Sequence, residues 1–234
     1  MRVIVLFLLL LIPASALGQP FEGETLYRVT TVRATPGTWQ DFMAHWKEVI
    51  ASWPDEVGER AFWMRHSQGD QWDFLFFFPL DDAGAWLSSA EHPMWSLGTD
   101  DRVAETSDLF AYGAPVGVLR PQAESAGFFH VEMFTAIPGS RERLLEQRRM
   151  ENAFLAGIGR PQNFIFRRHS GVAVDAFTLG FYRDIKHFAE SADVDPDLEE
   201  RSANAAGFDG VGGISPLLRS LIARHHDTLA VAIR

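Results

Sequence analysis

VEMFTAIPG at residues 131–139 and VTTVRATPG at residues 29–37 share one pattern, a short strand that runs into the turn sequence Ala-x-Pro-Gly. Several matches in one order and at nearly one spacing are characteristic of an internal repeat. The chain is therefore predicted to contain two copies of one structural unit. The other corresponding pairs are MRHS at 64–67 with RRHS at 167–170, WDFLFF at 72–77 with VDAFTL at 174–179, and APVGVLR at 114–120 with TLAVAIR at 228–234.

Each copy is predicted to run strand, helix, strand, strand, helix, strand. Alternating apolar residues and intervening turn residues such as Gln68-Gly69-Asp70 indicate the strands. This βαββαβ order is the ferredoxin-like arrangement, so the fold class is α+β. The expected strands are 26–34, 61–67, 72–79 and 114–120 in the first copy, and 128–136, 163–169, 175–182 and 228–233 in the second.

The first helix of each copy follows its Pro-Gly turn. After Gly37, Trp39, Phe42 and Trp46 recur at helical spacing and predict a buried apolar face. The second copy has its first helix at about 140–157 and its last near 216–226. The stretch 193–213, rich in Asp, Ala and Gly, is expected to be a long surface loop with a short helix.

The N-terminus has the pattern of a signal peptide. An apolar run of about ten residues follows Arg2, and Pro13 and small residues come directly after it. A membrane-spanning helix needs about 20 apolar residues, so we expect cleavage and no stable membrane anchor. The predicted location is periplasmic or secreted. The expected division is 1–18 signal peptide, 19–120 first unit, 121–127 linker and 128–234 second unit.

The composition limits the partners and the chemistry. The chain has no cysteine, which excludes thiol chemistry and disulfides. Its formal net charge of −10 disfavours nucleic acid as a partner. Aromatic residues make up 12% of the sequence, which suits a large apolar core or a small apolar or aromatic ligand.

The two A-x-P-G repeats and the βαββαβ order resemble the dimeric α+β barrel superfamily, which includes antibiotic-biosynthesis-monooxygenase-like and NIPSNAP-like proteins. The resemblance covers nearly all of the chain after residue 18. It implies that the two ferredoxin-like units form an intramolecular pseudo-dimeric barrel, either as a monomer or as a homodimer of such chains. The superfamily includes cofactor-free oxygenases, isomerases, haem-binding proteins and ligand-binding modules, so the fold alone decides no function.

A polar cluster interrupts the apolar face of the helix at 140–157. Arg148, Glu151 and Asn152 lie on or beside that face, and Arg148 occupies the position of Trp46 in the first copy. One interpretation is a ligand-binding cleft between helix and sheet, in which Arg148 holds an acidic oxygen among Phe166, Phe177 and neighbouring aromatic residues. The other is a structural pair of Arg148 with Glu151 at a partly wet helix edge.

A second candidate lies on the strand 128–136, where His130 and Glu132 point opposite to Val131 and Met133. If the two sheets pack face to face, His130 and Glu132 meet inside the barrel. His130 would then be a catalytic base and Glu132 its orienting group. The alternative is a structural hydrogen-bonded network.

The remaining histidines suggest a haem alternative and no other metal. His187 is the candidate haem ligand, and His169 is a second. His225 and His226 are expected on a helix, where neighbouring residues face different ways and form no metal site. We therefore expect no cofactor, with haem as the alternative.

Three functions follow from these patterns. The first is small-molecule binding by an oxygenase or isomerase that uses no cofactor. The second is a non-catalytic interaction module outside the cytoplasm. The third is haem binding.

Overall fold

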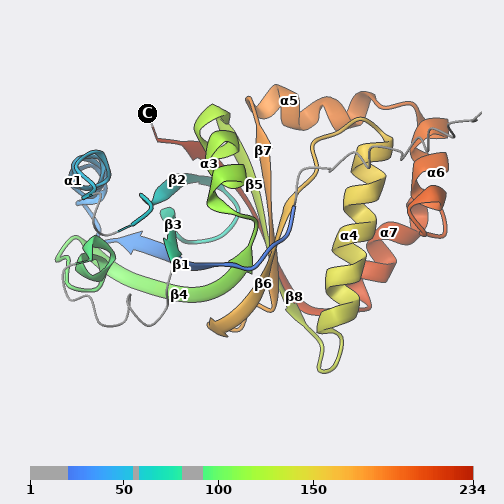
Figure 1. Ribbon diagram of the computed structural model, residues 1–234. Coiled ribbons are helices and arrows are strands. Elements are labelled where there is room, and N and C mark those ends of the chain that lie inside the picture. The colour runs from blue at the N-terminus through green and yellow to red at the C-terminus, as the bar shows by residue number, and fades with distance from the viewer. Residues whose placement is uncertain (1–20, 55–57, 81–91, 234) are drawn as a thin grey trace, which may run out of the picture.

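The computed structural model describes residues 21–54, 58–80 and 92–233 of the chain. The predicted signal peptide, 1–18, lies outside the described residues. Helices and strands are interspersed along the sequence, and the strands form one antiparallel, closed barrel (Figure 1). Among the described residues, no helix is both long and apolar enough to cross a membrane.

The described residues of the first half form four strands, a helix and a 3₁₀ helix, and a further helix leads into the second half. These elements are β1 (Thr25–Ala34), α1 (Trp39–Ala51), β2 (Phe62–Gln68), β3 (Phe74–Leu80), η2 (Pro93–Gly98), β4 (Val103–Gly113) and α3 (Val116–Ser125).

The second half repeats the strands and adds helices before its last strand. Its elements are β5 (Phe128–Ala136), α4 (Arg141–Gly157), β6 (Phe164–Gly171), β7 (Ala176–Tyr182), α5 (Ile185–Ala189), η3 (Glu190–Asp193), α6 (Pro196–Ala205), α7 (Val211–Arg219) and β8 (Ile222–Ala232).

The strand order around the barrel is β1-β3-β2-β8-β5-β7-β6-β4. Each half therefore contributes the order 4-1-3-2, and the halves meet where β2 pairs with β8 and β4 pairs with β6. Both junctions are antiparallel ladders, so the barrel that the described strands form has no free sheet edge. The helices lie outside it, with α1 on one side and α4, α6 and α7 on the opposite side (Figure 1).

Three apolar clusters follow from this arrangement. Side chains from both halves fill the barrel interior, where Tyr27 and Phe77 of the first half meet Phe166 and Phe177 of the second. A second cluster lies between α1 and the outer face of the first half. A third, smaller cluster around Phe134 lies under α4. Alternation along each strand gives one face to the interior and the other to a helix.

The predicted strand at 114–120 is wrong. The last strand of the first half is β4 (Val103–Gly113), which pairs with β1 on the side opposite β3. Residues 116–125 form α3. The strand was missed because its first half is polar and exposed, whereas the apolar run at 116–119 packs Leu119 against the barrel interior as a helix. Residues 121–125, predicted as linker, are consequently the second half of α3.

The end of the second half also differs from the prediction. The short helix expected within 193–213 is present as α6, whose Asp195 side chain accepts hydrogen bonds from the backbone N–H groups of Asp197 and Leu198, and α7 also begins in this stretch, at Val211. The expected helix at 216–226 ends at Arg219, and β8 begins at Ile222. His225 and His226 therefore lie on a strand and face opposite sides of the sheet.

Candidate functional site

The two halves fill the space under their first helices differently. In the first half, Phe42 and Trp46 of α1 pack on Phe74, Phe76 and Phe78 of β3. The second half has the same strand register, since Thr30 pairs with Phe76 and Glu132 pairs with Thr178. At the positions of Trp46, Phe74, Phe76 and Phe78 it carries Arg148, Ala176, Thr178 and Gly180. The aromatic core of one half is thus replaced by a polar cluster in the other.

Arg148 is the centre of this cluster and is 2% exposed. Its Nε donates to Gln147 Oε1 at 2.7 Å, its Nη1 lies 3.4 Å from Glu132 Oε2, and its Nη2 donates to Glu151. The guanidinium also lies over the Phe134 ring, 4.7 Å from its centroid. The predicted pair with Glu151 is present, but the predicted wet helix edge is wrong. Because protein groups engage the guanidinium, Arg148 positions the two carboxylates.

Glu132 receives contacts from three elements. His225 Nε2 lies 3.3 Å from its Oε1, and the Thr178 hydroxyl donates to its Oε2 at 3.0 Å. Burial raises the pKa of Glu132, but the His225 hydrogen bond and the charge of Arg148 outweigh burial and hold that pKa well below its usual range. Glu132 is therefore a buried, ionised carboxylate.

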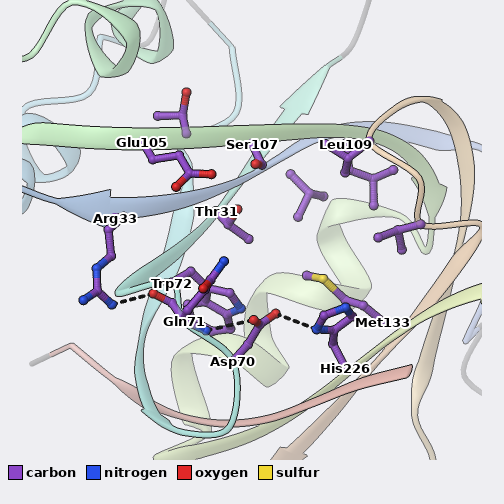
Figure 2. Close-up of a pocket in the computed structure, with 14 residues that line it drawn as sticks. Thr31, Arg33, Asp70, Gln71, Trp72, Glu105, Ser107, Leu109, Met133 and His226 are labelled. Atoms are coloured by element: carbon purple, nitrogen blue, oxygen red, sulfur yellow. Dashed lines mark hydrogen bonds and ion pairs between the residues drawn. The ribbon is translucent and has the colours of Figure 1, made fainter. Parts of the chain in front are cut away.

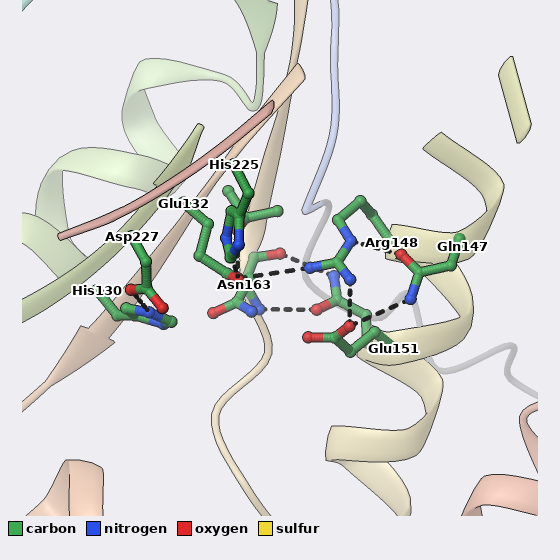
Figure 3. Close-up of polar contacts among 10 residues, drawn as sticks. His130, Glu132, Gln147, Arg148, Glu151, Asn163, His225 and Asp227 are labelled. Atoms are coloured by element: carbon green, nitrogen blue, oxygen red, sulfur yellow. Dashed lines mark hydrogen bonds and ion pairs between the residues drawn. The ribbon is translucent and has the colours of Figure 1, made fainter. Parts of the chain in front are cut away.

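His130 and Glu132 lie on the helix side of the sheet and not inside the barrel, so the predicted placement is wrong. Val131 and Met133 face the interior instead. The apolar face of β5 points into the closed barrel because apolar side chains from both halves fill that interior. The two candidate clusters predicted separately are consequently one cluster under α4 (Figure 3).

Phe166 and Phe177 also lie on the opposite face from the one predicted. Their rings stack 4.3 Å apart inside the barrel. They are separated from Arg148 by the sheet itself, so they cannot line a cleft together with it.

His130 pairs with a carboxylate that the sequence did not reveal. Its Nε2 lies 2.7 Å from Asp227 Oδ1, and the Phe188 ring packs against the imidazole at 5.2 Å. Burial lowers the pKa of His130. The hydrogen bond to Asp227 and the charge of Glu132 together raise that pKa by more than burial lowers it, so the net shift is upward. Asp227, and not Glu132, has the position of an orienting carboxylate for a general base.

The signal for Asp227 and His225 was present as a pattern. His-x-Glu at 130–132 and His-x-Asp at 225–227 each place two ligating side chains on one face of a strand. Strands β5 and β8 are neighbours, and Glu132 pairs directly with Asp227. The pattern was hidden because residues 216–226 were predicted to be helical.

Asn152 and Glu151 have structural partners. The Asn152 side chain donates to the Asn163 carbonyl at 2.7 Å and accepts from the Asn163 N–H at 2.8 Å, which fastens α4 to the segment before β6. Glu151 accepts hydrogen bonds from Arg148 and Gln147. Burial raises the pKa of Glu151, and the neighbouring charge of Glu132 adds to the rise, although Arg148 opposes it.

The cluster also has an exposed edge. The Asp227 side chain is 56% exposed and the His225 side chain 29% exposed, while the Glu132 side chain behind them is 10% exposed. The His225 ring stacks on Phe134 at 4.8 Å. A molecule approaching from solvent would therefore meet Asp227, His130 and His225 before the buried carboxylate.

A separate pocket of about 410 Å³ opens at one end of the barrel. Val29, Leu109 and Met133 form part of its apolar wall, and Asp70 lies 3.4 Å from His226 at its edge (Figure 2). It lies on the interior face of the sheet, so it does not connect to Arg148.

His187, the predicted haem ligand, lies on α5 and contacts neighbouring residues of the chain. Its Nδ1 accepts a hydrogen bond from the Arg183 N–H at 3.1 Å, and its ring packs on Tyr182. Neither this histidine nor His169, which is exposed beside Tyr112, lines the barrel-end pocket. A flat porphyrin needs an apolar slot beside its axial ligand.

The chain is similar in structure to proteins of low sequence identity. An anthrone oxidase-like protein matches with a TM-score of 0.62 and 11% identity, over 92% of this chain and 94% of that chain. A chlorite dismutase from Candidatus Nitrospira defluvii matches with 0.54 and 9%, over 91% and 93%. A haem-binding protein from Thermus thermophilus matches with 0.52 and 11%, over 89% and 91%.

No family model matches the sequence, and neither does any curated protein. At these identities the structural similarity concerns the fold alone. The chain has the dimeric α+β barrel fold of the chlorite dismutase type, as the resemblance predicted.

Proposed function

We propose that this protein binds a small apolar or aromatic molecule at the polar cluster under α4 and transforms it, as an oxygenase or isomerase does. The observation that carries the proposal is the replacement of an aromatic core by a polar cluster that is centred on the buried Arg148. A buried charge is costly unless it is paired, so a chain that needs only stability has no reason to exchange Trp46 and Phe76 for Arg148 and Thr178.

The exposed edge of the cluster supplies the chemistry. The His130 imidazole can accept a proton from the substrate, and Asp227 is positioned to stabilise the imidazolium that forms. The Phe188 ring beside His130 and the His225 ring offer flat apolar contacts. An aromatic substrate with an acidic proton fits this combination.

Native mass spectrometry of protein purified from its own host tests the proposal. We expect an extra mass that disappears on denaturation. His130→Ala is expected to lower the affinity for the bound molecule about tenfold, the effect of one lost hydrogen bond, and so to reduce the fraction of chains that carry the extra mass. Asp108→Asn is the matched control, because Asp108 lies on β4 at the position that Asp227 has on β8. A bare wild-type chain would overturn the proposal and favour the interaction module.

Haem binding is the alternative function, because the Thermus thermophilus neighbour is described as haem-binding. Titration with haemin tests it independently of any substrate. A Soret band that His187→Ala abolishes would support it, and no band would remove it.

We also infer that the chain is a fused pair of ferredoxin-like units. The identical strand order and register support this, and so does a repeated turn contact. The Asp73 carboxylate accepts from the Ala34 N–H at 2.9 Å, and the Asp175 carboxylate accepts from the Ala136 N–H at 2.9 Å. Export of the chain rests on residues 1–18 and is checked by fractionating cells and sequencing the N-terminus of the purified protein.

A further inference from the structure

Three side chains on neighbouring strands converge at the exposed edge of the cluster. His130 and Glu132 project from β5, and Asp227 projects from β8 directly opposite Glu132. One donor atom from each residue lies within 4.8 Å of the other two. Figure 3 shows the His130 and Asp227 side chains against each other, with Glu132 and His225 beside them.

The first half closes the corresponding position with its own cation. Arg28 occupies the place of His130, and its Nε and Nη2 donate to the two carboxylate oxygens of Asp108 at 2.9 and 3.0 Å. Thr30, at the place of Glu132, donates its hydroxyl to Asp108 at 2.7 Å. The guanidinium thus neutralises the strand carboxylate from within the chain.

The second half lacks that fixed cation and has more acid. Glu132, Glu151 and Asp227 bring three carboxylates together, and Arg148 contacts only the first two. The imidazole of His130, which carries no fixed charge, stands where the first half has a guanidinium. The site therefore groups ligating nitrogen and oxygen atoms without the fixed cation that holds the strand carboxylate in the first half, and a bound metal cation would take that place.

We propose that His130, Glu132 and Asp227 bind one divalent transition-metal ion. Imidazole nitrogen with carboxylate oxygen is a donor set for zinc and for first-row metals such as iron, cobalt and nickel, whereas magnesium and calcium prefer oxygen alone. His225, 3.3 Å from Glu132, orients that carboxylate as a second layer of the site.

The inference deepens the proposed function and rests on it for the substrate. A bound ion would occupy His130 Nε2 in place of a proton, which would be released to solvent. The ion, and not the imidazole, would then activate the substrate. Three protein donors leave at least one coordination position of the ion open. That position faces solvent, because Asp227 lies at the exposed edge of the cluster. The class of substrate that fits is a small molecule that presents a phenolate, enolate or carboxylate oxygen to the metal.

Calorimetric titration of chelator-treated full chain with zinc chloride alone tests the site. We expect one equivalent to bind, and His130→Gln or Asp227→Asn to weaken binding by more than about a hundredfold, the upper end of what is typical for losing a residue that only supports a ligand. Cobalt(II) titration gives an independent readout, because the weak ligand-field absorption of aqueous cobalt(II) shifts and becomes stronger when protein donors replace water in a site of lower coordination number. Circular dichroism of each variant verifies that the fold is retained.

Two controls locate the metal. Asp108→Asn removes the equivalent carboxylate of the first half, and His226→Gln removes the neighbouring histidine that faces the barrel interior. Neither is expected to change zinc binding. Absence of zinc binding, or binding that His130→Gln and Asp227→Asn leave unchanged, overturns the inference. Zinc binding without any captured small molecule would instead leave the metal site in place and contradict the proposed function.

Discussion

Arg148→Met is expected to lower the free energy of unfolding by about 3–5 kcal/mol, the usual effect of removing one partner from a buried ion pair. Methionine retains most of the volume and the helix propensity of arginine, so packing contributes little. The cost arises because Glu132 and Glu151 lose the guanidinium that they share. Urea denaturation followed by circular dichroism measures the change.

Arg149→Met is the matched control. Arg149 is the next residue of α4, and its pairs with Glu22 and Glu146 are exposed, with 44% of its side chain accessible. Exposed pairs contribute at most about 1 kcal/mol. An equal loss in the two variants would contradict the buried role of Arg148.

A second comparison isolates the charge. Adding Glu132→Gln and Glu151→Gln to Arg148→Met removes the uncompensated carboxylates, so much of the lost stability should return. If the triple variant is less stable than Arg148→Met, the two glutamates stabilise the fold through contacts other than their charge.

The sequence located part of this cluster because Arg148 breaks an apolar stripe that the helix Trp39–Ala51 keeps at the aligned position. Comparing Trp46 with Arg148 was sufficient to mark the place. It could not give the face of β5 that carries His130, because a strand with residues of both kinds fits either orientation. The barrel interior decides the orientation, and that interior exists only when both halves close.

The role of Asp227 was missed in the sequence for a related reason. Residues 224–227 are polar, and exposed polar residues at the end of an apolar pattern resemble a fraying helix as much as an edge of a strand. The strand β4 was missed in the same way, since Glu105, Ser107 and Asp108 interrupt it. Both strands are held by pairing with distant partners, β1 and β5, which local patterns do not contain.

Phe166→Ala is expected to destabilise the whole chain, by about 3–5 kcal/mol for a fully buried aromatic residue. The Phe166 ring stacks on Phe177 within its own half and meets Tyr27 and Phe77 of the first half at 5.6 and 5.7 Å. Loss of the ring therefore removes packing that belongs to both halves of the interior.

The seven tryptophans make the coupling measurable, because all of them precede residue 96 and so belong to the first half of the sequence. If the closed barrel is one cooperative unit, Phe166→Ala shifts the tryptophan-monitored urea transition as far as the transition seen by circular dichroism. Phe188→Ala is the control within the second half, since Phe188 packs outside the barrel on Phe128 and His130 and should shift both transitions less. A tryptophan transition that stays at the wild-type midpoint in Phe166→Ala would mean that the halves unfold separately, and that the ladders of β2 with β8 and β4 with β6 are too weak to couple them.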